Sequence, residues 1–201
     1  MAASNTESVR PRSGERSYST RANHLHRKET PMTPEQLRTL QAPIKARFRE
    51  NPASGQTVLV ATGELDRDQC VCRIPTGRGP VTEAGLHELT GGDGRWACSA
   101  AMLLEALIGC AGTTACVVST AMGIEFTLGK IRAEGDLDFR GTMGVSRETP
   151  VGFTAIRIVI ELNTPADAAA LTKLQELTER YCVVAQSLRT PVSCVVWRSG
   201  E

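Results

Sequence analysis

Cysteine is the residue type in this sequence with the widest range of chemistry, and the chain contains seven of them. An ionised cysteine is a nucleophile and a metal ligand, whereas a protonated cysteine in a core behaves as a small apolar residue. The number is odd and no apolar signal segment precedes them. We therefore expect reduced thiols in a cytoplasmic protein rather than a set of disulfide bonds.

The other candidates for site chemistry are weaker. Cys70 and Cys72 would face the same side of a strand, but no second pair completes a metal site, so we expect no metal. His24 and His26 lie in a polar segment without a third ligand. His87 is the only histidine outside that segment and thus the only acid or base of its type in the folded part. A lone histidine in a loop is nevertheless more often incidental.

Cys110 stands near the centre of the segment from Trp96 to Gly123, which must position it and which carries no charge from Ala106 onward. Residues 96–123 are rich in small and apolar residues and lack proline, which predicts a helix buried on nearly every side. Ser99 is a plausible N-cap, although Trp96 or Cys98 equally well marks the start. The uncharged stretch is long enough to cross a bilayer. Its glycines and hydroxyl residues make a poor lipid-facing surface, so we predict a core helix and no membrane partner.

Cys182 belongs to a second predicted helix, which begins at residues 163–165 and ends before Pro191. Its apolar residues recur at three- and four-residue spacing, and Cys182 sits beside that stripe. The buried stripe is Leu171, Leu174, Thr178, Tyr181, Ala185 and Leu188. On spacing alone, both Cys110 and Cys182 fit the role of small core residues as well as that of nucleophiles.

Alternating segments predict the strands that cover these helices. Residues 126–140 and 153–162 each show one apolar and one polar face, which is typical of an antiparallel pair with one solvated side. The inward residues of the second are Ile156, Ile158, Ile160 and Leu162. Residues 192–198, with Cys194, form a last strand. Strands grouped around helices without strict alternation indicate an α+β fold, with two main helices covered by antiparallel sheet.

The N-terminal part is predicted from turn and breaker residues. Residues 1–33 are polar and should be a disordered tail, followed by a domain over residues 34–201. Thr33 caps a short helix that should end before Pro43. Strands are expected at 44–49, 57–62 and 68–74, and a long loop at 74–94. The net charge of +1 gives no reason to expect a nucleic-acid partner.

Two of these segments resemble a known family. AMLLEALIGCAGTTACVVSTAMGI, which contains Cys110, resembles the first cysteine helix of the OsmC/Ohr family, and ERYCVVAQSL, which contains Cys182, resembles the second. AGLHELTGGDG is similar to a loop in one branch of the family, and the resemblance extends over about residues 48–197. It implies an OsmC-like intertwined homodimer and thiol-dependent reduction of organic hydroperoxides, without a cofactor.

The resemblance implies that Cys110 is the peroxidatic cysteine and Cys182 the resolving one. The disulfide that they form would be recycled by a dithiol or by a thioredoxin or lipoyl-type reductant. Members of the family typically hold an arginine near the thiol through a glutamate, but the matching helix positions 100 and 101 are alanines here. Glu105 lies about 140° around the helix from Cys110. The supporting candidates are Arg49, Arg47, His87 and Glu105.

A second hypothesis retains the OsmC-like fold without the peroxidase activity. Because the activating shell of the family is incomplete, the chain also fits a non-catalytic OsmC-like dimeric module. Such a module would bind a small apolar ligand or partner in the slot beside Cys110.

Overall fold

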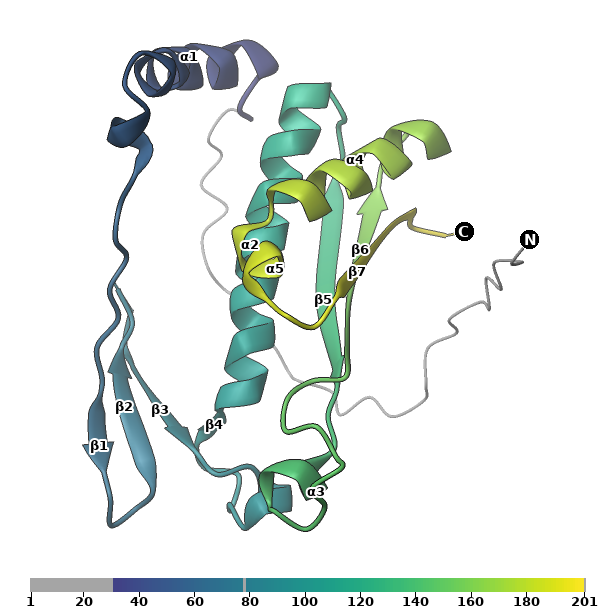
Figure 1. The fold of residues 1–201 in the computed structure, drawn as a ribbon. Coiled ribbons are helices and arrows are strands. Elements are labelled where there is room, and N and C mark those ends of the chain that lie inside the picture. The colour runs from purple at the N-terminus through teal and green to yellow at the C-terminus, as the bar shows by residue number, and fades with distance from the viewer. Residues whose placement is uncertain (1–30, 78, 201) are drawn as a thin grey trace. The chain divides into compact units, whose positions relative to one another are not determined.

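The computed structural model describes residues 31–77 and 79–200, so the expected polar tail lies outside the description except for its last three residues. The helices are α1 (Pro34–Glu50), α2 (Ser99–Met122), α3 (Phe139–Thr142), α4 (Ala168–Tyr181) and α5 (Val183–Ser187), with the short 3-10 helices η1 (Pro52–Gly55) and η2 (Glu88–Thr90) (Figure 1). The strands are β1 (Glu64–Asp66), β2 (Val71–Pro75), β3 (Val81–Gly85), β4 (Ala97–Cys98), β5 (Leu128–Asp136), β6 (Ala155–Asn163) and β7 (Val192–Arg198). The α+β class is confirmed.

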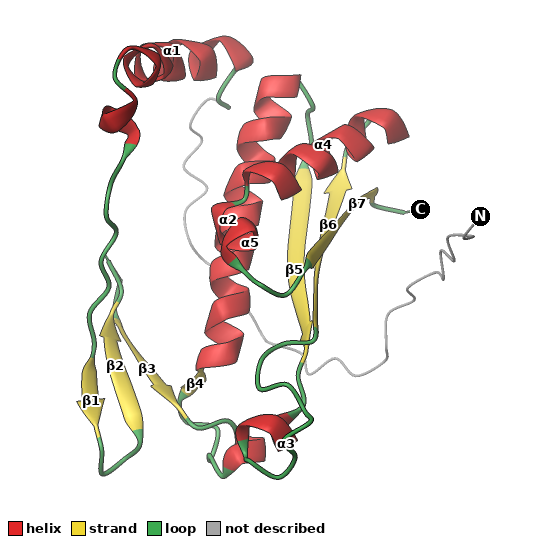
Figure 2. Ribbon diagram, in the orientation of Figure 1, coloured by secondary structure: helices red, strands yellow, loops and turns green. Residues whose placement is uncertain are grey.

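The sheet β5-β6-β7 forms one layer of the core. β5 and β6 pair antiparallel, as predicted, and β7 adds to β6 in parallel, so the sheet is mixed. The four inward residues predicted for β6 are all buried, with at most 3% of each exposed. They pack against α2 and α4, which lie on the same side of the sheet (Figure 2).

Helix α2 begins at Ser99, with Cys98 at the N-cap position, and ends at Gly123 in the left-handed conformation. Its buried residues Leu107, Ala111, Ala115 and Val118 recur every three or four residues and therefore share one face. By contrast, Cys116 and Val117 are exposed. The prediction of burial on nearly every side is wrong for the single chain, because the sheet and α4 cover only one face of α2.

Composition alone does not decide where α2 belongs. The helix is long and apolar enough to cross a membrane, and the core helix of a soluble protein passes the same test. The buried face of α2 joins the hydrophobic core with β6 and α4. This packing agrees with a core helix.

The second main helix is interrupted at Cys182. Asp167 caps α4, and its Oδ1 accepts a hydrogen bond of 2.8 Å from the Ala170 N–H, so the helix starts later than predicted. Cys182 has extended backbone angles (φ −75°, ψ 104°), which end α4 and place this residue at the N-cap of α5. The predicted continuous helix up to Pro191 is therefore wrong. Tyr181, which was expected in the buried stripe, is 56% exposed.

Helix α1 corrects the prediction for the first segment. The Thr33 cap is confirmed, since its hydroxyl and the Gln36 side chain form a reciprocal capping box. The helix does not end before Pro43, however, and it includes the expected strand at 44–49. A proline inside a helix costs about 3 kcal/mol. Leu37, Leu40, Ile44 and Phe48 follow helical spacing, although only Leu37 of the four is buried in the described chain.

The strands after α1 form a separate sheet with the order β1-β2-β3-β4. The strand expected at 57–62 is wrong, because residues 56–63 have no assigned helix or strand in the described chain. The expected loop at 74–94 contains β3 and η2. Cys70 lies in the turn before β2 with φ 54°, so it does not share a strand with Cys72.

Candidate thiol site

The structure brings Cys110 and Cys182 together. Cys110 lies in the middle of α2, and Cys182 lies at the break between α4 and α5, both of which pack against α2. Their side chains are near enough to shift each other's pKa, and both thiols are free. Two cysteines that are distant in sequence are thus neighbours in the folded chain.

The surroundings of Cys110 favour its ionised form. Burial raises the pKa of the Cys110 thiol, but hydrogen bonds outweigh this effect and the pKa lies below its ordinary value of 9.0. The strongest of these bonds comes from the Val184 N–H, followed by the Cys182 thiol and the Val183 N–H. The first N–H groups of a helix have no acceptor within it, so α5 offers them to the sulfur.

Thr114 also lies beside Cys110 and lowers its pKa slightly. Its hydroxyl donates a hydrogen bond of 2.8 Å to the Cys110 carbonyl oxygen, one turn back along α2. A hydroxyl has one proton to donate. The hydroxyl can therefore donate to the Cys110 sulfur only after it rotates away from the carbonyl oxygen. We assign Thr114 a minor role in lowering the pKa of Cys110.

The pKa of the Cys182 thiol is shifted in the opposite direction, above its ordinary value. Burial raises the pKa of its thiol, and the hydrogen bond to Cys110 and the negative charge that Cys110 develops raise it further. The N–H groups of Ala185 and Val184 act against these effects without overcoming them. The pair therefore contains one thiol whose ionised form is favoured relative to an ordinary cysteine and one whose ionised form is disfavoured.

The supporting candidates from the sequence lie in different places. Arg47 and Arg49 are exposed in the last turn of α1, and the Arg47 guanidinium stacks over the Phe48 ring at 5.4 Å. Glu105 is exposed on α2. The main influences on the pKa of Cys110 among the described residues include none of these three and no other cation.

His87 is tied into its own loop. Its Nδ1 accepts a hydrogen bond of 3.0 Å from the Leu89 N–H, and its ring stacks on Phe139 with centroids 4.5 Å apart. It lines a cavity with Ser99 and Leu103, at the N-terminal end of α2. The described contacts of His87 therefore lie away from the middle of α2, where Cys110 is found.

Sequence reasoning missed the backbone donors that lower the pKa of Cys110. Every residue except proline carries an N–H, so residue types at positions 183 and 184 give no sign of this role. The signal would have been the helix break at Cys182, because only a new helix start frees those groups. The absence of proline after Cys182 is consistent with this role.

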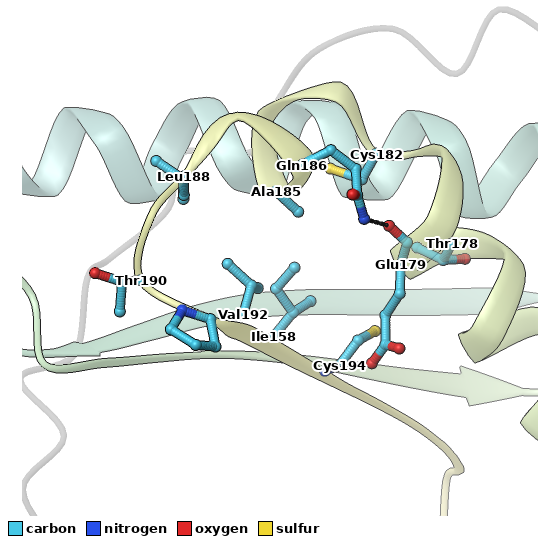
Figure 3. A pocket seen from close by; sticks show the side chains of 11 residues that line it. Ile158, Thr178, Glu179, Cys182, Ala185, Gln186, Leu188, Thr190, Val192 and Cys194 are labelled. Carbon is cyan, nitrogen blue, oxygen red and sulfur yellow. Dashed lines mark hydrogen bonds between the residues drawn. The ribbon is translucent and has the colours of Figure 1, made fainter.

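A cavity of about 290 Å³ lies on the side of Cys182 that faces β6 and β7 (Figure 3). Glu179 is the one charged side chain in its lining, and its Oε1 accepts a hydrogen bond of 2.9 Å from the Cys194 N–H. The lining residues are Ile158, Thr178, Glu179, Cys182, Ala185, Gln186, Leu188, Thr190, Pro191, Val192 and Cys194.

Cys194 shares this cavity with Cys182 but has a different environment. Burial, together with the negative charges of Glu179 and Cys182, raises the pKa of the Cys194 thiol to about 12. No group of three or more His, Cys, Asp or Glu side chains that could hold a metal ion was found among the described residues. The site can therefore supply a nucleophilic thiolate and a neighbouring thiol that can close a disulfide bond.

Comparisons with known proteins place this geometry in a family context. The family model described as OsmC-like protein matches residues 92–196, which is more than half of the chain. No curated protein sequence matched. An OsmC-like protein from Mycoplasma pneumoniae has a similar structure, with a TM-score of 0.58, 15% identity and coverage of 71% of this chain and 98% of that chain.

Two further structures have the same fold at similarly low identity. The organic hydroperoxide resistance protein OsmC from Legionella pneumophila has a TM-score of 0.52, 13% identity and coverage of 72% of this chain and 99% of that chain. The organic hydroperoxide resistance protein OhrB of Bacillus subtilis has a TM-score of 0.51, 14% identity and coverage of 71% and 100%.

Proposed function

Because this chain belongs to the OsmC-like protein family, we propose that it is a thiol-dependent peroxidase that reduces organic hydroperoxides to alcohols. The observation that carries the proposal is the neighbouring pair of Cys110 and Cys182, in which the pKa of one thiol is lowered and that of the other is raised. Two proteins with the same fold bear the name organic hydroperoxide resistance protein, which supports the same chemistry.

The first step uses Cys110 as the nucleophile. Its thiolate attacks the terminal oxygen of the hydroperoxide, the O–O bond breaks, and the alcohol leaves after taking up a proton. The sulfur becomes a sulfenic acid, and it has given two electrons to the peroxide. The N–H groups of Val183 and Val184 favour the ionised sulfur before the attack.

The second step uses Cys182 as the resolving thiol. Its sulfur attacks the sulfenic sulfur of Cys110, the S–S bond forms, and water leaves with the proton of the Cys182 thiol. A dithiol, or a thioredoxin or lipoyl-type reductant, then returns the pair to its reduced state. A reducing compartment such as the cytoplasm suits a protein with free cysteines.

We further propose that the protein works as an intertwined homodimer. Val58, Leu59 and Val60 are 84%, 90% and 80% exposed in a segment that joins no sheet among the described residues. The exposed side of α2 is equally open, since a methyl group at Gly109 would meet no atom within 4 Å. Apolar surfaces of this kind mark sites of association, and a second copy of the chain would cover them.

Stopped-flow mixing with cumene hydroperoxide and dithiothreitol tests the activity. The wild-type protein should consume the peroxide in repeated cycles, and Cys110→Ser should lose turnover while its circular dichroism spectrum stays unchanged. Cys116→Ser, a substitution at an exposed cysteine on the same helix, is the matched control and should keep full turnover. Peroxide consumption that persists in purified Cys110→Ser protein would overturn the proposal, whereas a wild-type protein that consumes no peroxide would favour the non-catalytic module.

A further inference from the structure

We propose that the cavity beside Cys182 is where the reductant binds, that Cys182 is the sulfur it attacks, and that the carboxylate of Glu179 selects small uncharged dithiols over anionic ones. This inference rests on the proposed function. It assigns to the described cavity a role that is distinct from the reaction with peroxide at Cys110.

The lining of the cavity decides which sulfur an incoming thiol meets. Cys182 is 0% exposed at the surface but forms part of the wall of this cavity, whereas the partly buried Cys110 on α2 is outside the lining. In Figure 3 the wall across from Cys182 is formed by β6 and β7, with Cys194 and the Glu179 carboxylate side by side. A volume of about 290 Å³ is at the small end of the range for ligand sites. It suits a short dithiol or a single thiol-bearing arm.

The reduction then proceeds in two exchanges. The first thiolate of the dithiol attacks the Cys182 sulfur, the bond to Cys110 breaks, and Cys110 leaves as a thiolate. The second thiol of the dithiol then attacks the dithiol sulfur that is bonded to Cys182. The mixed disulfide breaks, and the proton of this second thiol passes to the Cys182 sulfur. The dithiol leaves as a cyclic disulfide, having given up two electrons and two protons, and Cys110 and Cys182 are again a thiolate and a thiol.

The surroundings of the two sulfurs favour this direction of attack. In thiol–disulfide exchange, the sulfur whose thiol has the lower pKa leaves faster. The N–H groups of Val183 and Val184 stabilise the Cys110 thiolate, and burial disfavours the Cys182 thiolate. Attack on Cys182 therefore expels the better leaving group, whereas attack on Cys110 would expel the poorer one.

Glu179 gives the cavity its charge. Its Oε1 is held by the Cys194 N–H at 2.9 Å, and its backbone carbonyl accepts a hydrogen bond of 2.9 Å from the Gln186 side chain. No other lining residue is charged. An anionic thiol that enters this partly enclosed space is repelled, and at such a short range salt screens the repulsion only in part.

Two dithiols of matched size test the selection. The disulfide form of the protein is reduced with dihydrolipoamide, which is uncharged, or with dihydrolipoate, which is anionic; both are 1,3-dithiols that close a five-membered cyclic disulfide. We expect the uncharged dithiol to react about tenfold faster, and Glu179→Gln to reduce that ratio about fivefold. Glutamine keeps an oxygen that accepts from the Cys194 N–H. Glu176→Gln, an exposed change outside the cavity lining, should leave the ratio unchanged.

A second measurement does not depend on peroxidase activity. In Cys110→Ser protein, Cys182 is modified by 2-(trimethylammonio)ethyl or 2-sulfonatoethyl methanethiosulfonate, and mass spectrometry of its peptide gives each rate. The cationic reagent should be faster, and Glu179→Gln should bring the two rates together. Equal rates in both backgrounds would overturn the inference and leave the proposed function intact. Failure to form a Cys110–Cys182 disulfide would instead reject the proposed function, while the modification rates still report on the cavity.

Discussion

Cys110 and Cys194 belong to or pack against the same hydrophobic core, yet their pKa values shift from the ordinary cysteine value in opposite directions. Cys110 is half-buried on α2, and its pKa is lowered even though burial acts to raise it. Cys194 is 2% exposed on β7, and its pKa is raised to about 12. Cys182 is close enough to influence both of them.

The difference lies in where the nearby backbone N–H groups point. At the start of α5, the Val183 and Val184 N–H groups have no acceptor within the helix and turn to the Cys110 sulfur. On β7, the Cys194 N–H is already taken by Glu179, whose negative charge then opposes ionisation of the nearby thiol. The donors at the start of α5, and no cation among the described residues, account for the lowered pKa of Cys110.

Alkylation at neutral pH should show this contrast most strongly. With a pKa of about 12, roughly one Cys194 thiol in 10⁵ is ionised at pH 7. We expect iodoacetamide to modify Cys110 at least about a thousandfold faster than Cys194 in the native protein. Peptide mass spectrometry at timed intervals measures both rates. Comparable rates would contradict the proposed difference in pKa between Cys110 and Cys194.

Stability at alkaline pH should depend on Cys194. Because its folded-state pKa of about 12 is above the ordinary 9.0, its contribution is complete below pH 9 and is lost as pH rises from about 9 to 12. The loss amounts to about 4 kcal/mol. Urea unfolding of Cys194→Ala should show a smaller decline over this range than the wild type. An identical decline in both proteins would show that folding leaves the pKa of the Cys194 thiol unchanged.

Removal of Cys182 should weaken the activation of Cys110. Cys182→Ala deletes one hydrogen bond to the thiolate, so the Cys110 pKa should rise and its alkylation at pH 6 should slow by about threefold to tenfold. Without a resolving thiol, excess peroxide should also convert Cys110 to the sulfinic acid. Mass spectrometry of the Cys110 peptide reports both changes. An alkylation rate as fast as that of the wild type would mean that the backbone donors suffice alone.

Thr114 should have the smallest effect. Thr114→Val removes a hydroxyl whose proton is already given to the Cys110 carbonyl, so alkylation of Cys110 at pH 6 should change less than about threefold. The same peptide-resolved assay measures it. A larger decrease would show that the hydroxyl turns to the sulfur and ranks with the α5 donors.

The sequence predicted the parts of the fold in which pattern and packing coincide. Alternation along β6 identified Ile156, Ile158 and Ile160 as buried, because one face of that strand meets the helices within the same chain. The stripe of α4 was found for the same reason. The two cysteine segments, recognised by resemblance, do meet in the structure.

Other predictions failed where the sequence pattern was ambiguous or the partner was missing. Residues 44–49 alternate, but the same apolar residues also fit a helix, and α1 continues through Pro43 to Glu50. Residues 57–62 are suited to a strand, yet they pair with nothing among the described residues. The break at Cys182 has no strong sequence signal, so the α5 donors were not foreseen.

One oxidation experiment tests the central claim most directly. The fully reduced protein is mixed with one equivalent of cumene hydroperoxide, quenched in acid, digested and mapped by mass spectrometry. The account predicts a disulfide between the Cys110 and Cys182 peptides, with Cys194 still a free thiol. Consumption of the peroxide with both Cys110 and Cys182 left as free thiols would contradict it.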